Sequence, residues 1–484
     1  MRNVSASLTS SRWMGGALLF LSLAAGTGIR AWLSLHDDGI YWPDEIYQSL
    51  EPAHRLAFGY GMIAWEFVEG ARSWLLPGAL AGLLKVSAQL GLDSPREYLW
   101  LVRLLFSALS LLAAFGSYRL ASAYRAPFLP ATLAASLCAL AAPLIYFAPR
   151  AMSENASAAA VVWGLALVLH PDSRHTGRIS GSSLLALAVL LRLQNVVFCV
   201  GALGILAARR NWRVAGEVLG VLVAWAFLGG LLDKLTWGGW FHSSLVYLKF
   251  NLVEGRAAQW GVSEFAYYFR VLWTSMPAIT LVLAFLVPLA LIRAPGLELT
   301  CLAFLLLHSW IPHKEMRFLL PALPVIFALA GIGASVFWER LASGGVVLIT
   351  SAIAAAAGLS AVRFHALTFG ELGQYEQTKP DASAYDDQGD INRLLLAAHE
   401  LPDLCGLKVE AVHLAWTGGF TYLHRNVPLY PHTGPPRQSM FYNYVLTSAD
   451  WDGGEVAKSA GRFVLRRLPW PVCAVDSNYS WRLP

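Results

Sequence analysis

Two acidic residues, Asp44 and Glu45, lie side by side near the start of the chain, directly after Pro43. Proline fixes its own backbone dihedral and the neighbouring aromatic residues restrict the segment further, so we expect both carboxylates to be held in place. A fixed carboxylate can act as a general base that takes a proton from a hydroxyl group. The competing interpretation is an acidic cap on the helix that follows. The spacing alone slightly favours the cap.

The same segment contains further polar and aromatic residues. Between residues 45 and 58 the apolar residues recur on one stripe, which predicts an amphipathic helix lying in a membrane interface. A lid over a substrate is an alternative that is compatible with such a helix. The candidate substrate-contacting residues here are Glu51, His54, Trp65 and Glu66.

A second group of charges lies between two apolar runs, where His313, Lys314 and Arg317 provide three cations within five positions. We expect Lys314 and Arg317, three positions apart, to share one face of a helix. Cations at the boundary between water and lipid suit an anionic lipid head group. The alternative is an ordinary charged turn whose long side chains reach into water.

Four more polar residues interrupt or flank apolar runs. Arg150 and Glu154 follow one run, and Arg192 and Gln194 lie in the middle of another. These arginines could contact an anionic ligand, and Arg192 could equally be satisfied by an internal ion pair with Glu154. The sequence favours neither interpretation.

The composition defines the kind of chain that positions these groups. Of 484 residues, 56% are hydrophobic and only 14% are charged, compared with roughly 25% charged in ordinary soluble domains. This excludes a soluble cytosolic enzyme, and the high apolar and aromatic content excludes disorder. The net charge of +5 is spread along the chain, so we expect no nucleic-acid partner. The sequence predicts an all-α polytopic membrane protein.

Apolar runs long enough, or nearly long enough, to span a membrane predict about eleven transmembrane helices. The run at 180–208 is too long for one helix and carries polar residues at its centre, so we read it as two short helices joined by a polar turn. The other runs are at 13–35, 99–118, 126–147, 156–170, 214–232, 270–292, 297–311, 318–337 and 345–363.

The distribution of Lys and Arg predicts a cytoplasmic N-terminus. The segment 36–98, with its interfacial helices, and the His313 turn then lie on the external side. This assignment requires the apolar stretch 74–92 to lie in the interface. Residues 1–363 would form the transmembrane module, and the more polar residues 364–484 a small external C-terminal α/β domain.

Five cysteines divide into two groups. Cys138, Cys199 and Cys301 lie in apolar runs and read as small buried hydrophobic residues. Cys405 and Cys473 lie in the polar C-terminal part, where they could form a disulfide in an oxidising compartment or remain two unrelated thiols. Phosphate-binding glycine loops, HExxH elements, zinc-type Cys/His spacings and Gly-x-Ser-x-Gly elbows are absent, so no competing chemistry is indicated and we expect no cofactor.

Taken together, the charged segments resemble a known family. Pro43-Asp44-Glu45 with the residues up to Arg72, and the element His313-Lys314-Glu315-Met316-Arg317-Phe318, resemble the dolichyl-phosphate-mannose-dependent α-mannosyltransferases of glycosyltransferase family 22. The resemblance runs from about residue 36 to about residue 430. The second element is the more specific of the two. The run from Arg150 to Asn155 departs from the family's usual pattern, which places the glutamate later.

The resemblance implies a GT-C fold and transfer of mannose, with inversion and without a metal, from a polyprenyl-phosphate donor to a glycolipid or glycan acceptor. Asp44 would be the general base and Glu45 a neighbour that orients it. The donor phosphate would be held by His313, Lys314 and Arg317, supplemented by Arg192 and Arg150. Further substrate contacts would come from Glu51, His54, Trp65, Glu66, Glu154 and Gln194.

Several alternatives stay open at this point. The donor sugar could be arabinose, glucose or galactose, because hydroxyl discrimination leaves no readable pattern in a sequence. A lipid transporter or a non-catalytic subunit is disfavoured, because the charges collect at helix ends without a repeat. Rich in Ala, Leu and Arg and with short loops, the chain resembles bacterial proteins, which predicts an inner-membrane location with a periplasmic site, or a lumenal site in the endoplasmic reticulum if it is eukaryotic.

Overall fold

The computed structural model describes residues 2–338, 340–374, 380–385, 389–470 and 472–483, with side chains from Trp13 onward. The chain forms two compact units. We call Met1–Leu33, Leu104–Pro149 and Ser153–Ala382 the helical unit, and Ser34–Arg103, Arg150–Met152 and Ser383–Pro484 the mixed unit. The segment predicted as the catalytic loop thus belongs to the same unit as most of the C-terminal residues. The predicted domain boundary after residue 363 stays a prediction.

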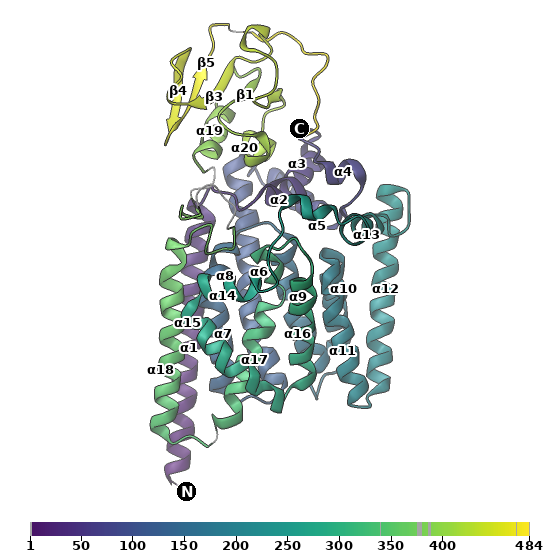
Figure 1. Ribbon diagram of the computed structural model, residues 1–484, viewed down its shortest axis with the longest axis vertical. Coiled ribbons are helices and arrows are strands. Elements are labelled where there is room, and N and C mark those ends of the chain that lie inside the picture. The colour runs from purple at the N-terminus through teal and green to yellow at the C-terminus, as the bar shows by residue number, and fades with distance from the viewer. Residues whose placement is uncertain (1, 339, 375–379, 386–388, 471, 484) are drawn as a thin grey trace. The chain divides into compact units, whose positions relative to one another are not determined.

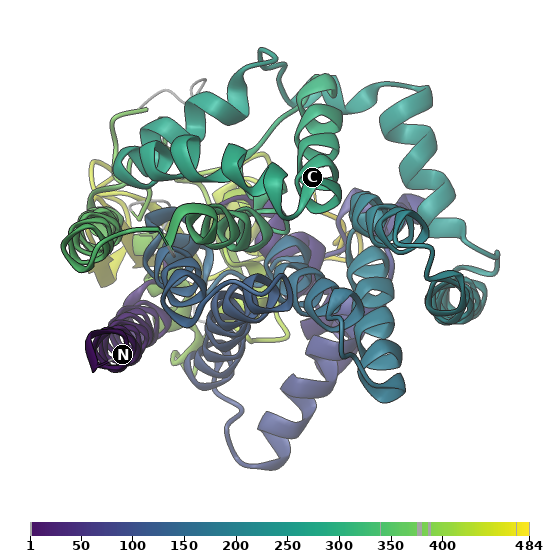
Figure 2. The same ribbon diagram turned by 90° about the horizontal axis from the view of Figure 1, so that it is seen from below.

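Long helices that run side by side make up the helical unit (Figure 1), and Figure 2 shows many of them end-on. Two of them, α1 and α6, also extend into the mixed unit. The helices are α1 (Arg2–His36), α6 (Pro95–Ala123), α7 (Phe128–Leu140), α8 (Ala142–Phe147), α9 (Ser153–Leu169), α10 (His175–Leu191), α11 (Val196–Ala208), α12 (Trp212–Trp237), α13 (His242–Leu248), α14 (Tyr267–Ser275), α15 (Pro277–Leu286), α16 (Pro295–Trp310), α17 (Leu323–Trp338) and α18 (Ser343–Arg363).

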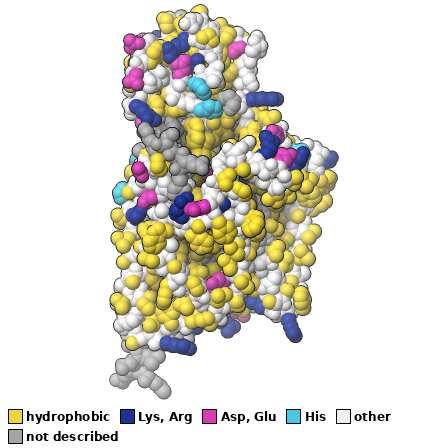
Figure 3. Space-filling view, viewed as in Figure 1, with side chains coloured by type: hydrophobic (Ala, Val, Ile, Leu, Met, Phe, Trp, Pro, Cys, Tyr) yellow, Lys and Arg dark blue, Asp and Glu magenta, His cyan; other side chains and the backbone are white. Residues whose placement is uncertain are grey.

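Four helices in the described part of the chain are long and apolar enough to cross a membrane: Trp13–His36, Pro95–Ala123, Trp212–Trp237 and Ser343–Ala366. Several shorter apolar helices accompany them, so the count of about eleven spans stays a prediction. On the face in Figure 3, hydrophobic side chains cover the helical unit and charged ones are few between its two ends. This surface suits contact with lipid.

Prolines break some of the predicted apolar runs. The run at 270–292 divides at Met276, which precedes Pro277 and leaves the helical backbone region. A residue before proline is disfavoured in a helix, which explains the break between α14 and α15. The run at 126–147 also divides, at Ala141, which has an extended backbone and lies two residues before Pro143.

The predicted division of the run at 180–208 is confirmed. Helix α10 ends at Leu191, and Arg192 has an extended backbone with φ −148° and ψ 110°. A single 3₁₀ turn, Leu193–Asn195, then leads into α11. Three polar side chains in the middle of an apolar run are therefore presented by a turn instead of a continuous helix.

Helices α7 and α17 form the densely packed centre of the helical unit. A Cβ atom at Gly331 would lie 2.7 Å from the Pro130 carbonyl oxygen, so the two helices approach closely only because this residue is glycine. Small residues at such contacts are typical of helices that pack in membranes.

The mixed unit combines helices and one sheet. Its helices are α2 (Pro43–Glu45), a π-helical turn at Ile46–Leu50, α3 (Glu51–Phe58), α4 (Trp65–Glu69), α5 (Leu75–Gln89), α19 (Gly389–His399) and α20 (Gly419–Leu423). Its strands are β1 (Leu407–Val409), β2 (Leu429–Tyr430), β3 (Tyr444–Ser448), β4 (Glu455–Ala460) and β5 (Phe463–Arg467). The order in the sheet is β2-β1-β3-β5-β4, with β1 parallel to both neighbours and β5 antiparallel to β3 and β4.

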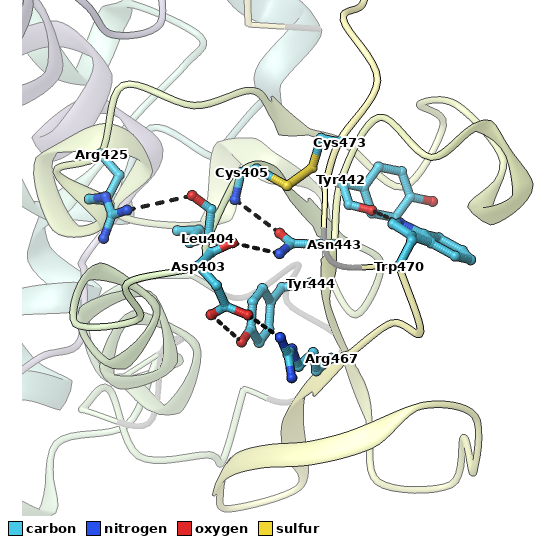
Figure 4. Close-up of a disulfide and its surroundings, with 10 residues drawn as sticks. All are labelled: Asp403, Leu404, Cys405, Arg425, Tyr442, Asn443, Tyr444, Arg467, Trp470 and Cys473. Carbon is cyan, nitrogen blue, oxygen red and sulfur yellow. Dashed lines mark hydrogen bonds and ion pairs between the residues drawn. A yellow bond between two sulfur atoms is a disulfide. The ribbon is translucent and has the colours of Figure 1, made fainter.

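Cys405 and Cys473 form a disulfide, which decides between the two alternatives left open by the sequence (Figure 4). The bond joins the loop before β1 to the segment after β5. Beside it, the Asn443 side chain accepts a hydrogen bond from the Cys405 amide at 3.0 Å and donates one to the Asp403 carbonyl at 2.7 Å. Together these links tie the C-terminal segment to the sheet.

Candidate active site

Asp44 and Glu45 occupy the first turn of α2, after Trp42 with its extended backbone and with Pro43 as the first helical residue. This is the position expected of an acidic cap. The two side chains nevertheless differ in exposure, because Asp44 is half-buried whereas Glu45 is only 5% exposed. Of the adjacent pair, Asp44 has the more exposed side chain.

The Glu45 carboxylate is bound from two sides within the mixed unit. It accepts a hydrogen bond from the Tyr41 amide at 3.1 Å, and Nη1 of Arg150 lies 3.6 Å from its Oε2. Burial raises the pKa of Glu45, although the charge of Arg150 partly opposes this shift. Glu45 therefore fixes the backbone that carries Asp44.

Arg150, only 2% exposed, binds the segment before α2. Its Nη2 lies 2.6 Å from Oδ2 of Asp37, and its Nη1 donates a hydrogen bond to the Gly39 carbonyl. With the contact to Glu45, these interactions bind one guanidinium to both ends of the segment 37–45. The geometry favours a role for Arg150 in holding the segment 37–45 over the predicted contact with the donor phosphate.

Glu66 lies on α4 beside the Asp44 segment. Its carboxylate is buried and accepts a hydrogen bond from the Gln48 side chain at 2.8 Å. Burial, and then the nearby charge of Asp44, raise the pKa of Glu66 to about 7. The structure thus brings Glu66 close enough to Asp44 for the two carboxyl groups to interact electrostatically. The half-buried Trp65 precedes it as the first residue of α4.

Glu51, predicted to contact substrate, is fully buried at the start of α3. Its carboxylate accepts hydrogen bonds from the amides of Met62, Phe420 and Thr421 and from the Thr421 hydroxyl, at 2.8–3.2 Å. Phe420 and Thr421 lie in the first turn of α20, whose free amides need such an acceptor. The contacts favour a capping role that joins α3 to α20.

His54 is also buried and lies against His424. Its Nδ1 donates to the Tyr60 carbonyl at 3.0 Å, so the neutral ring accepts a hydrogen bond from His424 through Nε2, at 2.8 Å. Burial and the neighbouring His424 lower the pKa of His54 to about 3. Glu51 and His54, both predicted to contact substrate, therefore stabilise the mixed unit.

A second group of charged residues lies in the helical unit, around Glu154 at the start of α9. Oε1 of Glu154 is 3.0 Å from Nη2 of Arg192 and 3.4 Å from Nη1 of Arg317. All three side chains are buried. The ion pair between Arg192 and Glu154 was one of the two alternatives for Arg192. Gln194, in the same turn as Arg192, donates to the Tyr247 hydroxyl at 2.5 Å.

Glu315 organises the predicted phosphate-binding element. It pairs with Arg317 through two hydrogen bonds of 2.7 and 2.8 Å, and Nε2 of His313 lies 3.1 Å from its Oε1. Burial opposes ionisation of Glu315, but the charge of Arg317 and the hydrogen bonds from His313 and Arg317 outweigh burial and lower its pKa to about 2. Glu315 is therefore a permanent anion that holds two predicted phosphate ligands.

The expectation that Lys314 and Arg317 share one helix face is wrong. Pro312 follows the end of α16, and Glu315 has an extended backbone with φ −140° and ψ 149°. Only a short 3₁₀ turn, Met316–Leu319, follows. The Lys314 ammonium instead donates to the carbonyls of Ser263 at 2.8 Å and Pro312 at 3.4 Å.

The charges of this second group do not balance. Arg192 and Arg317 pair with Glu154 and Glu315, so these four charges balance. Lys314, next to Glu315 in the chain, adds a third positive charge, and its ammonium contacts the backbone carbonyls named above. We call these five residues and His313 the cation cluster. One positive charge is in excess even when His313 is neutral, which favours an anionic ligand.

Two important residues were missed by the sequence reasoning. Glu315 was present in the quoted element but had no assigned role, although a carboxylate among cations signals an ion pair. Asp37 precedes the expected catalytic pair, and its contact with Arg150 spans 113 positions. No local pattern in the sequence identifies such a contact.

A family model described as the Alg9-like mannosyltransferase family matches residues 22–385. The chain belongs to this family. The matched region contains Asp44, the cation cluster and the polar turn at Arg192. The resemblance stated from the sequence is confirmed.

Curated relatives point in the same direction. The chain is similar to GPI mannosyltransferase 3 of Yarrowia lipolytica, with 31% identity over 60% of this chain and 57% of that protein. It is also similar to GPI alpha-1,2-mannosyltransferase 3 of Bos taurus, with 28% identity over 60% of this chain and 54% of that protein. The matches thus span little more than half the length of these relatives.

Solved structures show the fold. ArnT from Cupriavidus metallidurans gives a TM-score of 0.58 at 15% identity, covering 94% of this chain and 98% of ArnT. The form of ArnT bound to undecaprenyl phosphate gives a TM-score of 0.56 at 15% identity, covering 92% of this chain and 97% of ArnT. The Archaeoglobus fulgidus oligosaccharyltransferase gives a TM-score of 0.56 at 12% identity, covering 90% of this chain and 69% of that enzyme. This Alg9-like protein has the GT-C fold and is an integral membrane protein, as predicted.

Proposed function

We propose that this protein is a glycosyltransferase that moves mannose from a polyprenyl-phosphate-mannose donor to a hydroxyl group of a lipid-linked or glycan acceptor. The observation that carries the proposal is the cation cluster, formed by the element His313–Phe318 in a chain of the Alg9-like mannosyltransferase family. Relatives named as mannosyltransferases support mannose as the sugar.

The cation cluster supplies what a phosphate leaving group requires. When the glycosidic bond breaks, the lipid phosphate gains negative charge, and fixed cations stabilise that charge in the transition state. The excess positive charge and the paired, immobile guanidinium of Arg317 fit this task. The undecaprenyl phosphate bound to the similarly folded ArnT has the same chemical group. Because the cations already neutralise the phosphate, the proposal includes independence of divalent metals.

Asp44 is the proposed general base. It takes the proton from the acceptor hydroxyl as that oxygen attacks the anomeric carbon and the phosphate leaves. Direct attack from the face opposite the phosphate inverts the configuration, so a β-linked donor yields an α-mannoside. The half-buried position of Asp44, on a segment fixed by Glu45 and Arg150, supports this assignment.

The disulfide supports an external location of the mixed unit. Disulfides persist in oxidising compartments, such as the bacterial periplasm and the lumen of the endoplasmic reticulum. Cys405–Cys473 belongs to the same unit as Asp44. The proposed orientation therefore places the catalytic segment outside and the N-terminus in the cytoplasm.

The test is a transfer assay. Purified protein in detergent receives radiolabelled polyprenyl-phosphate mannose and a lipid extract from its host, with and without EDTA, and the Asp44→Asn variant is assayed in parallel. The proposal expects a labelled product from the wild type, unchanged by EDTA, and almost none from the variant. Transfer only from the arabinose, glucose or galactose donor would overturn the sugar assignment. No transfer from any donor would overturn the enzymatic proposal.

A further inference from the structure

A pocket of about 300 Å³ lies in the helical unit where α9 ends and α10 begins. Residues of α6, α9 and the following loop line it. Glu154 of the cation cluster lies at the start of α9, and the pocket lies beyond its other end. Since α9 has 17 residues, the two sites are separated by about 25 Å along its axis. The pocket is therefore no part of the proposed active site.

Two arginines line this pocket, Arg119 near the end of α6 and Arg174 just before α10. Within the described parts of the chain, neither guanidinium makes an ion pair or a hydrogen bond. Asp172 is the acidic residue of the lining, so one positive charge is in excess. The pocket therefore has a net positive charge that can bind an anionic group.

The start of α10 adds hydrogen-bond donors. No side chain caps this helix, although its first four amides have no acceptor within the helix itself. Thr176 and Gly177, in this first turn, line the pocket. Helix starts of this kind bind phosphate groups, because both the free amides and the helix dipole favour negative charge.

The walls are held firmly. The Trp163 indole donates to the Leu112 carbonyl at 2.8 Å, and a Cβ at Gly116 would lie only 2.9 Å from the Trp163 ring. Arg178 donates to the Ser173 carbonyl at 2.6 Å and pairs with Glu217 at 2.7 Å. The aromatic wall and the loop are therefore positioned without a ligand, as in preformed binding pockets.

We propose that this pocket binds the phosphate group of an anionic phospholipid. It lies where the apolar helices α6 and α9 end, which is the level of lipid head groups, and tryptophan is enriched at this level. Basic pockets between membrane helices bind such head groups. Simple snorkelling of the two arginines would explain their exposure, but not the preformed pocket that contains them.

Native mass spectrometry of the delipidated protein tests this inference. Phosphatidylglycerol and the zwitterionic phosphatidylcholine are added separately at equal concentrations. We expect one retained phosphatidylglycerol per chain and at least about tenfold weaker retention of phosphatidylcholine. Equal retention of both lipids would overturn the proposal. Complete displacement by an equimolar amount of inorganic phosphate would also overturn the lipid assignment, because it would identify a site for the free anion.

Matched variants locate the site. R119Q/R174Q should reduce phosphatidylglycerol retention about tenfold, whereas R119K/R174K, which keeps both charges, should retain most of it. R125Q/R210Q removes two exposed charges outside the pocket and should behave like the wild type. Unchanged binding in a folded R119Q/R174Q variant would overturn the proposal. The outcome is independent of the transfer assay, so the two proposals fail separately.

Discussion

Arg317 and Glu315 form a two-point contact, with Nε 2.7 Å from Oε2 and Nη2 2.8 Å from Oε1. The extended backbone of Glu315 makes the contact possible across only two positions. On a helix, residues two apart point to different faces and cannot pair. The guanidinium is thereby oriented by the protein before any ligand binds.

Replacing Arg317 with lysine should weaken donor binding. A lysine keeps the charge but cannot reproduce the forked contact with Glu315, so the cation is no longer fixed. We expect the apparent donor KM to rise about tenfold with a smaller change in kcat. Steady-state kinetics with varied donor concentration measure this, with Arg270→Lys, at an exposed ion pair, as control.

Replacing Arg317 with alanine should have a second effect on stability. It leaves the Glu315 carboxylate buried with its main partner missing, which costs about 3–5 kcal/mol. A lower melting temperature for Arg317→Ala than for Arg317→Lys would agree with this. An unchanged donor KM in both variants would place the phosphate site elsewhere.

Asp44→Asn should remove most turnover and leave the fold intact, because an amide cannot accept the acceptor's proton. We expect kcat to fall about 10²- to 10⁴-fold while the donor KM changes little. Glu69→Gln, which neutralises an exposed carboxylate on α4, is the control and should keep full activity. Wild-type turnover in Asp44→Asn would refute the assignment of the base.

The stability of the protein should depend on pH through Glu66. Its pKa is about 7 in the folded state and near 4.5 when unfolded, so the folded state retains a proton that the unfolded state releases between these values. The contribution of Glu66 to the free energy of unfolding therefore falls as pH rises from about 4.5 to 7.

The Glu66→Gln variant isolates this effect, because glutamine stays neutral throughout. We expect its melting temperature, relative to the wild type, to be higher at pH 8 than at pH 5. Titrating groups that do not interact with Glu66 are common to both proteins and cancel in the difference, whereas Asp44, which interacts with Glu66, contributes to the same effect. A difference that is the same at both pH values would contradict the raised pKa.

Removing the disulfide should destabilise the mixed unit. Cys405 and Cys473 are separated by 68 positions, and closing a loop of this length stabilises a fold by about 4 kcal/mol in the chain-entropy model. Intrinsic fluorescence should show a lower unfolding midpoint for the double serine variant and for the reduced wild type. The reductant should not affect the serine variant. Identical midpoints would show that the bond does not constrain the unfolded chain.

The parts of the fold that depend on local patterns were predictable from the sequence. The polar turn after α10 follows from Arg192 and its neighbours, which interrupt an apolar run. The two acidic residues and the cationic element were likewise recognisable from their spacing, as was the helical character of residues 45–58. Polar groups are costly in lipid, so they stand out in such a sequence.

The parts that depend on distant contacts were not predictable. Arg150 and Glu51 were expected to bind substrate, but the side chains that they contact lie 113 and 370 positions away. The two-point contact of Arg317 with Glu315 depends on a backbone conformation that residue types alone do not specify. The residues most easily mistaken for substrate contacts were therefore those that hold the protein's own segments together.

The cap that Glu51 provides for α20 has a consequence for biosynthesis. At translation rates of about 5–20 residues per second, Thr421 is made roughly 20–70 s after Glu51. Until then the carboxylate lacks three of its four hydrogen-bond donors and cannot be buried at an acceptable cost. The segment that carries Asp44 therefore completes its folding only after α20 has been made. A nascent chain delayed before that point would be inserted in the membrane yet catalytically silent, and would expose its unfinished segment to proteolytic quality control.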